Sequence, residues 1–203
     1  MKQIILFIVA VLLSAPALAQ SLRLPAIFSV TGVAANDTLN IRSQPNGESA
    51  DIGDLFPNQL VEVITIDANN RWGKVAVNGE QSGWVSMRYL APITPQPTLG
   101  SVPTSLICSG TEPFWSLNIT TEASLSLSIF GETTTSEPIT RATTSVNSGD
   151  MVNAYITQNM TALLRRANCT DGMSDRDFGW ALDLIDTRNG ISLLSGCCTA
   201  DLP

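Results

Sequence analysis

Short runs of alternating apolar and polar residues follow one another along most of the chain. Leu39 and Ile41 alternate with polar neighbours, and residues 72–77 and 83–85 flank the pair Asn78-Gly79. Alternation with period two predicts half-buried strands, and an Asn-Gly pair between two such runs predicts a hairpin. No helical period of useful length competes with these strands, so the pattern predicts a small β-barrel in the first half of the chain.

The second half shows the same period. Leu125, Leu127 and Ile129 alternate with serines, and two further runs, residues 180–186 and 191–197, predict a closing hairpin. Residues 160–166 are the one segment that has helical potential. We therefore expect a mainly β protein in which a second β-barrel or sandwich follows the first barrel.

The first module carries a series of short motifs in a fixed order. They read L-N-I-R-S-x-P, I-G-x-L, V-E-V-I, R-W-G-K-V and G-W-V, beginning at Leu39 and ending at Val85. This series closely resembles the bacterial SH3 domain, a small β-barrel of exported proteins that commonly holds cell-wall peptides. The resemblance implies an SH3-like module over residues 26–91 that binds a peptide.

Aromatic residues of this module are the first candidates for a ligand site. Trp72 and Trp84 stand one on each strand of the predicted hairpin, and stacked aromatic side chains make a floor for an extended peptide. Tyr89 and the acidic loop residues Asp67 and Glu80 complete the candidate set. The alternative interpretation is that one tryptophan belongs to the barrel core.

The second module, residues 106–203, contains two polar motifs. They are G-T-E-P-F-W from Gly110 and C-T-D-G-M-S-D-R from Cys169, and they resemble a group of exported bacterial β-domains with no established activity. The candidate surface residues of this module are Glu112, Trp115, Asp171, Asp175 and Arg176. A calcium loop needs six to eight oxygen ligands, and the EF-hand spacing is absent. A tight turn at Asp171-Gly172, with Arg176 beside a buried carboxylate, is the favoured interpretation.

The four cysteines all belong to the second module. Cys108, Cys169, Cys197 and Cys198 form an even set, which in an oxidising compartment predicts two structural disulfides. Neighbouring residues of a strand point to opposite faces, so Cys197 and Cys198 are each expected to pair with Cys108 or Cys169. One disulfide with two free thiols is the alternative. Without C-x-x-C spacing, no metal is expected.

The segments before and after the first module predict export of the protein and a linker between the modules. Residues 1–19 combine Lys2, a ten-residue apolar run and an Ala-x-Ala site, which predicts a cleavable signal peptide. Proline recurs in residues 92–105, which predicts a semi-rigid linker between the modules. We therefore expect a soluble periplasmic or secreted protein without stable membrane insertion after cleavage.

Charge and composition narrow the function further. The chain has a formal net charge of −7 and no histidine. Nucleic-acid binding needs clustered lysine and arginine, and histidine-dependent triads or histidine-ligated zinc need histidine, so these classes are excluded. The expected function is non-catalytic binding of peptidoglycan or an envelope protein, with no cofactor. The alternatives are a carboxylate-dependent wall hydrolase and an inhibitor of an envelope hydrolase.

Overall fold

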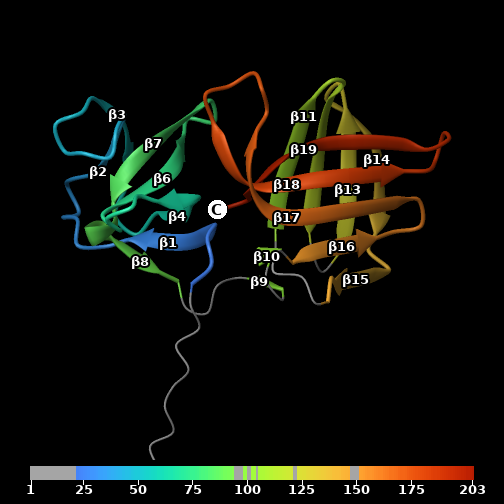
Figure 1. Ribbon diagram of the computed structural model, residues 1–203, viewed down its shortest axis with the longest axis horizontal. Coiled ribbons are helices and arrows are strands. Elements are labelled where there is room, and N and C mark those ends of the chain that lie inside the picture. The colour runs from blue at the N-terminus through green and yellow to red at the C-terminus, as the bar shows by residue number, and fades with distance from the viewer. Residues whose placement is uncertain (1–21, 94–97, 100–101, 104, 121–122, 147–150) are drawn as a thin grey trace, which may run out of the picture.

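A computed structural model of the chain describes residues 22–93, 98–99, 102–103, 105–120, 123–146 and 151–203. The predicted signal peptide and parts of the predicted linker lie outside these residues. Among the described residues the only helical element is a three-residue 3-10 turn, η1 (Met87–Tyr89), and the remaining regular structure is β. The prediction of a mainly β protein is confirmed. Two β modules lie next to each other in Figure 1.

The N-terminal module consists of two small sheets that share one core. The three-stranded sheet has the order β4-β1-β8, and the five-stranded sheet has the order β3-β2-β7-β6-β5. Its strands are β1 (Ala26–Val30), β2 (Leu39–Arg42), β3 (Asp51–Leu55), β4 (Leu60–Val63), β5 (Thr65–Ile66), β6 (Trp72–Val77), β7 (Gln81–Ser86) and β8 (Leu90–Pro92). Residues from both sheets, among them Val30, Val63, Val75 and Val85, are fully buried in this core.

The C-terminal module is one antiparallel nine-stranded sheet that curls into a half-barrel. Its order is β14-β13-β12-β11-β19-β18-β17-β16-β15. The strands are β11 (Ser105–Thr111), β12 (Phe114–Thr120), β13 (Ser124–Ile129), β14 (Glu132–Pro138), β15 (Arg141–Thr144), β16 (Val152–Ile156), β17 (Met160–Thr170), β18 (Asp177–Asp186) and β19 (Ser192–Ala200). A short ribbon of β9 (Thr98–Leu99) and β10 (Val102–Pro103) precedes the sheet in the chain.

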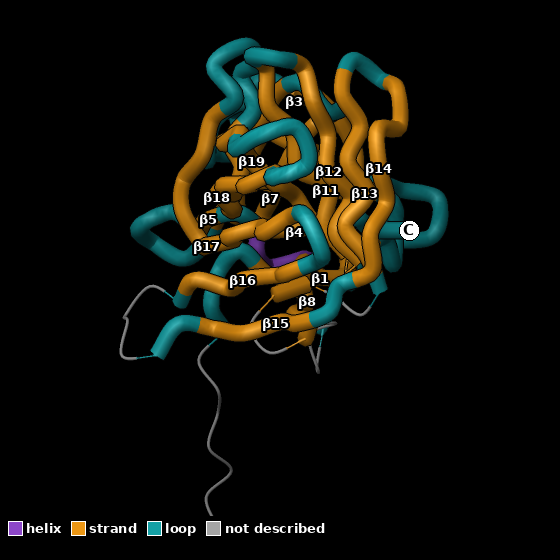
Figure 2. The backbone as a smooth tube through the Cα atoms, turned by 90° about the vertical axis from the view of Figure 1, so that its right-hand side faces the viewer, coloured by secondary structure: helices purple, strands orange, loops and turns teal. Residues whose placement is uncertain are grey.

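Curling brings two halves of the sheet face to face around a core. Figure 1 shows β11 to β14 upright behind β16 to β19, which cross in front of them, and Figure 2 shows the curve from the side. The inward residues of both halves, including Leu117, Leu127, Leu164 and Leu182, form one buried cluster. The alternating serines of β13 point away from it, as the period of two predicts.

The segment with helical potential is a strand. Residues 160–166 belong to β17, which pairs with β16 on one side and β18 on the other. The helical potential of this segment is not realised, because two neighbouring strands take up its backbone hydrogen bonds. Alternate residues Met160, Ala162 and Leu164 are buried, which is the period of a strand.

The two disulfides of the second module join Cys108 to Cys198 and Cys169 to Cys197. The prediction of two disulfides, with the neighbouring cysteines in different bonds, is confirmed, and the alternative with two free thiols is excluded. Cys108 and Cys198 stand opposite each other on β11 and β19, whereas Cys169 reaches β19 from the far end of β17. The last strand is therefore linked covalently to both halves of the sheet.

Trp115 lies in the half-barrel core, with 4% of its surface exposed, and is not a surface residue as expected from sequence. Its indole lies over two glycines. A methyl group on Gly110 would stand 2.3 Å from the indole Nε1, and one on Gly196 would stand 2.7 Å from Cζ2. The glycines of the G-T-E-P-F-W and G-C-C motifs therefore make room for this side chain.

We expect that Gly196→Ala lowers the free energy of unfolding by about 1 to 3 kcal/mol, the usual cost of overpacking a core. The added methyl would meet the Ser109 carbonyl oxygen at 2.1 Å as well as the indole, so backbone must shift. Urea unfolding would measure the change. Gly47→Ala is the matched control, since nothing lies within 4 Å of a methyl group there. Equal stability of the two variants would contradict this account of Trp115 packing.

Candidate functional site

Both candidate tryptophans lie on the outer face of the β6–β7 hairpin. Along β6 the residues Gly73, Val75 and Val77 are buried while those between them are half-buried. Trp72 therefore points away from the core, and the same alternation in β7 places Trp84 on the same face. The interpretation that one tryptophan is barrel core is wrong. Both rings are partly accessible, and neither belongs to the core cluster.

Lys74 covers Trp84 and connects it to the second module. The two residues stand opposite each other across the hairpin, and the Lys74 ammonium lies 5.0 Å from the centre of the indole ring. The same ammonium lies 2.7 Å from the Asp177 carboxylate at the start of β18. One lysine thus contacts an aromatic ring of one module and a carboxylate of the other.

The remaining candidates of the first module divide between the two ends of the hairpin. Asp67 lies at the Trp72 end, where its carboxylate accepts the N–H groups of Trp72 and Arg71 at 2.8 and 2.6 Å. These hydrogen bonds, that of Trp72 foremost, hold the pKa of Asp67 below its usual value. Tyr89, in η1, follows Met87, whose N–H donates to the Arg71 carbonyl at this end, and the Tyr89 side chain packs against the core of the module.

Glu80 lies at the opposite end of the hairpin, in the turn between β6 and β7. Its N–H donates to the Val77 carbonyl at 3.2 Å, and its side chain is exposed. The length of β6, about 17 Å for six extended residues, separates this turn from Asp67. The structure therefore brings Trp72, Asp67 and Tyr89 to one end of the hairpin and leaves Glu80 at the other.

Residues 175–177 of the second module run along the Glu80 end. Asp175 forms a parallel β-bridge with Gln81, and the N–H of Asp177 donates to the Ser82 hydroxyl at 2.8 Å. Between them, Arg176 donates to the Gly79 carbonyl at 3.5 Å and stacks over Phe178. The second module therefore covers one half of the hairpin, and the Trp72 half lies away from this contact.

Glu62 is a buried carboxylate at the centre of the interface between the modules. It stands on β4, is 7% exposed, and points away from the core of its own module. One oxygen accepts the Trp180 indole N–H at 2.9 Å, and the other accepts the Thr199 hydroxyl at 2.7 Å and the Ala200 N–H at 3.1 Å. Three donors from β18 and β19 thus bind one side chain from β4.

Arg176 is a partly buried positive charge of the second module, on the side that faces the first module. Burial lowers the pKa of the Arg176 guanidinium, while the negative charges of Glu62 and Asp171 act in the opposite direction. Among the described residues Arg176 forms no ion pair with a carboxylate: it donates to the Gly79 carbonyl, and its Nε is buried without a partner. Sequence reasoning missed Glu62, because V-E-V-I shows that it faces outward but not what covers that face.

Asp171 shapes a turn. Its carboxylate accepts the N–H groups of Ser174 and Met173 at 2.9 and 3.0 Å, and Gly172 follows with φ of +73°. These hydrogen bonds, led by that of Ser174, lower the pKa of Asp171. The carboxylates of Asp171 and Asp177 have separate partners, and within the described part of the chain no group of three or more metal-ligating side chains is found.

The two polar motifs of the second module meet at this turn. The Thr111 hydroxyl donates to the Asp171 carbonyl at 3.4 Å, which joins the β11–β12 turn to residues 171–174. Glu112 is exposed in the β11–β12 turn, and Asp175 forms a backbone β-bridge with Gln81 in the hairpin of the first module. Of the candidate surface in this module, Glu112 faces solvent, whereas Asp175 and Arg176 contribute to the interface.

Residues 37–91 match the family model of the bacterial SH3 domain. The chain thus carries a bacterial SH3 domain there, followed by a C-terminal β-domain with two disulfides. The match begins after β1, which nevertheless pairs with β4 and β8 of the same module. None of the curated proteins compared with this chain matches it. No helix in the described ranges is long and apolar enough to cross a membrane.

Proposed function

We propose that this protein is a non-catalytic binding protein of the bacterial cell envelope, whose SH3 domain holds an extended peptide. The domain match supports binding of cell-wall or peptide ligands in general. The ligand class proposed here is the peptidoglycan stem peptide or an extended segment of an envelope protein. Two disulfides fit an oxidising compartment such as the periplasm, reached through the predicted signal peptide.

The observation that carries this proposal is the outer face of the hairpin around Trp72. This indole is half-buried, stands outside the core and lies away from the part of the hairpin that residues 175–177 contact. A rigid aromatic face of this kind offers a large contact area at small entropic cost. Asp67, whose carboxylate accepts the N–H groups of Arg71 and Trp72, lies at the same end of the β6–β7 hairpin, as does Tyr89.

The non-catalytic assignment is supported by three carboxylates at the interface or close to it, two from the second module and one from the first. Asp171 and Asp177 are engaged in a turn and a salt bridge, and the buried Glu62 is bound by three donors. A pair of carboxylates that hydrolyses a glycan must instead face the sugar from two sides. We expect no release of soluble fragments when the protein is incubated with labelled peptidoglycan, and such release would favour the hydrolase alternative.

We expect that Trp72→Ala weakens binding to purified peptidoglycan about thirtyfold while the protein still unfolds cooperatively. Truncation of an aromatic anchor in an interface costs about 2 kcal/mol or more, and every 1.4 kcal/mol is about tenfold in affinity. Co-sedimentation and thermal unfolding are measured on the same variants.

Phe56→Ala serves as the matched control, because Phe56 is a 65% exposed aromatic residue of the same module outside the hairpin. Unchanged sedimentation of Trp72→Ala, or an equal loss in both variants, would remove the hairpin face as the ligand site.

A further inference from the structure

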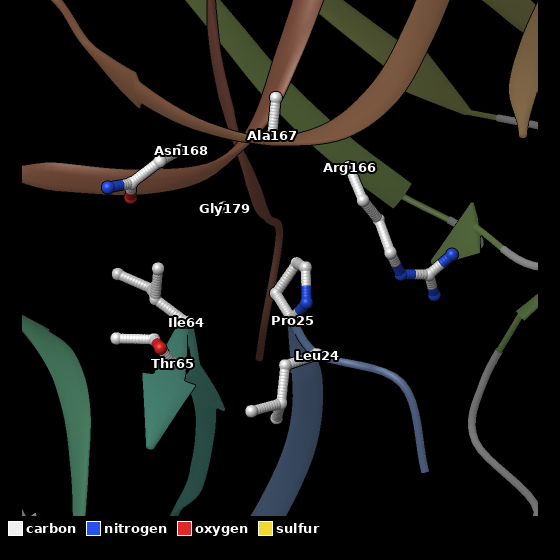
Figure 3. A pocket seen from close by; sticks show the side chains of 8 residues that line it. All are labelled: Leu24, Pro25, Ile64, Thr65, Arg166, Ala167, Asn168 and Gly179. Atoms are coloured by element: carbon white, nitrogen blue, oxygen red, sulfur yellow. The ribbon is translucent and has the colours of Figure 1, made fainter. Parts of the chain in front are cut away.

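A pocket of about 390 Å³ opens between the two modules. Figure 3 shows Pro25 in its centre, Ile64 and Thr65 on the side of the SH3 domain, and Arg166 and Asn168 extending from β17 on opposite sides of Pro25. Domain interfaces are frequent places for small-ligand sites, and this volume lies in the range of such sites.

A β-bulge in β17 shapes the upper wall of the pocket. Arg166 pairs with Trp180 and Cys169 pairs with Phe178, so Ala167 and Asn168 stand together opposite Gly179. A bulge interrupts the ladder and redirects side chains, which is frequent beside binding sites. The disulfide from Cys169 to Cys197 directly follows and ties the bulge to β19.

The lower wall belongs to an edge strand. Thr65 is part of β5, which stands last in the five-stranded sheet and pairs only with β6 in that sheet. The edge of a sheet offers backbone donors and acceptors to an added extended peptide. Leu24, Pro25 and Ile64 add an apolar surface next to this edge.

Arg166 brings a positive charge that no described carboxylate pairs with. Its guanidinium stacks 4.6 Å from the Trp180 ring, and its Nε is buried with no hydrogen-bond partner among the described residues. Burial lowers the pKa of Arg166, and the positive charge of nearby Arg23 lowers it further. An external carboxylate in the pocket would pair with this partly buried charge.

We propose that this pocket binds the carboxyl-terminal end of a short aliphatic peptide, with the terminal carboxylate on Arg166. A small side chain would lie against Leu24, Pro25 and Ile64, and Asn168 and Thr65 would hydrogen-bond the peptide backbone. This inference rests on the proposed peptide-binding function and adds which end of the peptide is recognised. A free protein terminus carries L residues, whereas a cell-wall stem peptide also carries D residues.

The test uses alanyl-alanine as the probe. The full-length protein is titrated with L-Ala-L-Ala and with D-Ala-D-Ala, each as the free acid and as the carboxyl-terminal amide, and binding is followed by NMR chemical shifts. We expect saturable binding of at least one acid, with shifts in residues 64–65 and 166–168, and about tenfold weaker binding of its amide. Hydrogen bonds to charged groups are stronger than neutral ones, which sets this expectation. The stereoisomer that binds identifies the source of the ligand.

Arg166→Gln is expected to bind acid and amide equally. Arg166→Lys keeps the charge without the planar fork and is expected to retain part of the preference for the acid. Arg165→Gln is the matched control, because this adjacent arginine pairs with Asp183 at 2.7 Å and does not line the pocket. Thermal unfolding of each variant confirms that the fold persists.

Three results would overturn the inference: no binding of either acid, equal binding of acid and amide by the wild type, or unchanged acid binding by both Arg166 variants. The result of the dipeptide titration can be distinguished from the result of the Trp72→Ala sedimentation test. If Trp72→Ala abolishes sedimentation with peptidoglycan but the dipeptides do not bind, only the pocket is rejected. If the dipeptides bind through Arg166 but Trp72→Ala changes nothing, only the hairpin site is rejected.

Discussion

Glu62→Ala is expected to lower the free energy of unfolding by about 3 to 5 kcal/mol. The change removes a buried acceptor and leaves the Trp180 indole N–H, the Thr199 hydroxyl and the Ala200 N–H without the partner that they have now. Each buried donor without a partner costs about 1 to 3 kcal/mol. Arg176 also loses one of the two negative charges that act on its guanidinium.

Urea unfolding followed by tryptophan fluorescence measures this change, because Trp180 itself reports on the interface. Glu62→Gln keeps the size and one acceptor oxygen, so we expect a loss smaller than that of alanine. Glu80→Ala, an exposed carboxylate of the same module, is the control and should change stability by about 0.5 kcal/mol at most. If Glu62→Ala and Glu80→Ala unfold alike, the carboxylate does not stabilise the association of the modules.

Removing the Cys108–Cys198 disulfide by a double change to alanine is expected to destabilise the half-barrel by about 4 to 5 kcal/mol, and removing Cys169–Cys197 by about 3 to 4 kcal/mol. These values follow from the entropy of closing loops of the two lengths. The paired cysteines are 90 and 28 residues apart in the chain, so the first bond constrains the unfolded chain more.

Hydrogen exchange locates the effect. We expect faster exchange in peptides from residues 105–203, with residues 26–91 little changed, because all four cysteines lie in the second module. Ser109→Ala is the control, because it changes a half-buried residue beside Cys108 without removing a disulfide. Equal loss of protection in both modules, or a larger effect of the shorter loop, would contradict this expectation.

Local pattern predicted the strands well, because a period of two is set by the backbone alone. The β6–β7 hairpin and the β18–β19 hairpin follow from Asn-Gly turns between alternating runs. The separation of Cys197 and Cys198 into two bonds follows from the same alternation. Residues 160–166 have helical potential because leucine, alanine and arginine favour helices, and pairing with two strands outweighs that preference.

The interface was not predictable in the same way. Alternation shows that Glu62 and Lys74 point outward, yet the sequence does not say whether solvent or another module lies there. Trp115 shows the opposite case, since it was expected on the surface of the second module and lies in the core. Its burial depends on Gly196, which is distant in the chain and adjacent only after the sheet has formed.

The position of β19 has a consequence for the order of assembly. This strand follows every other strand of the half-barrel in the chain, yet it lies in the middle of the sheet between β11 and β18. Strands β11 to β14 and β15 to β18 each form as successive hairpins, and among the described strands only β19 pairs with both groups. A nascent chain that lacks residues 192–200 would therefore hold two four-stranded ribbons without strand pairing between them, linked by the hydrogen bonds of Glu137 to Thr157 and Asn159. The nine residues of β19 complete the sheet and supply one cysteine to each disulfide. They also supply two of the three donors to Glu62, so all of these interactions form only after β19 has been added.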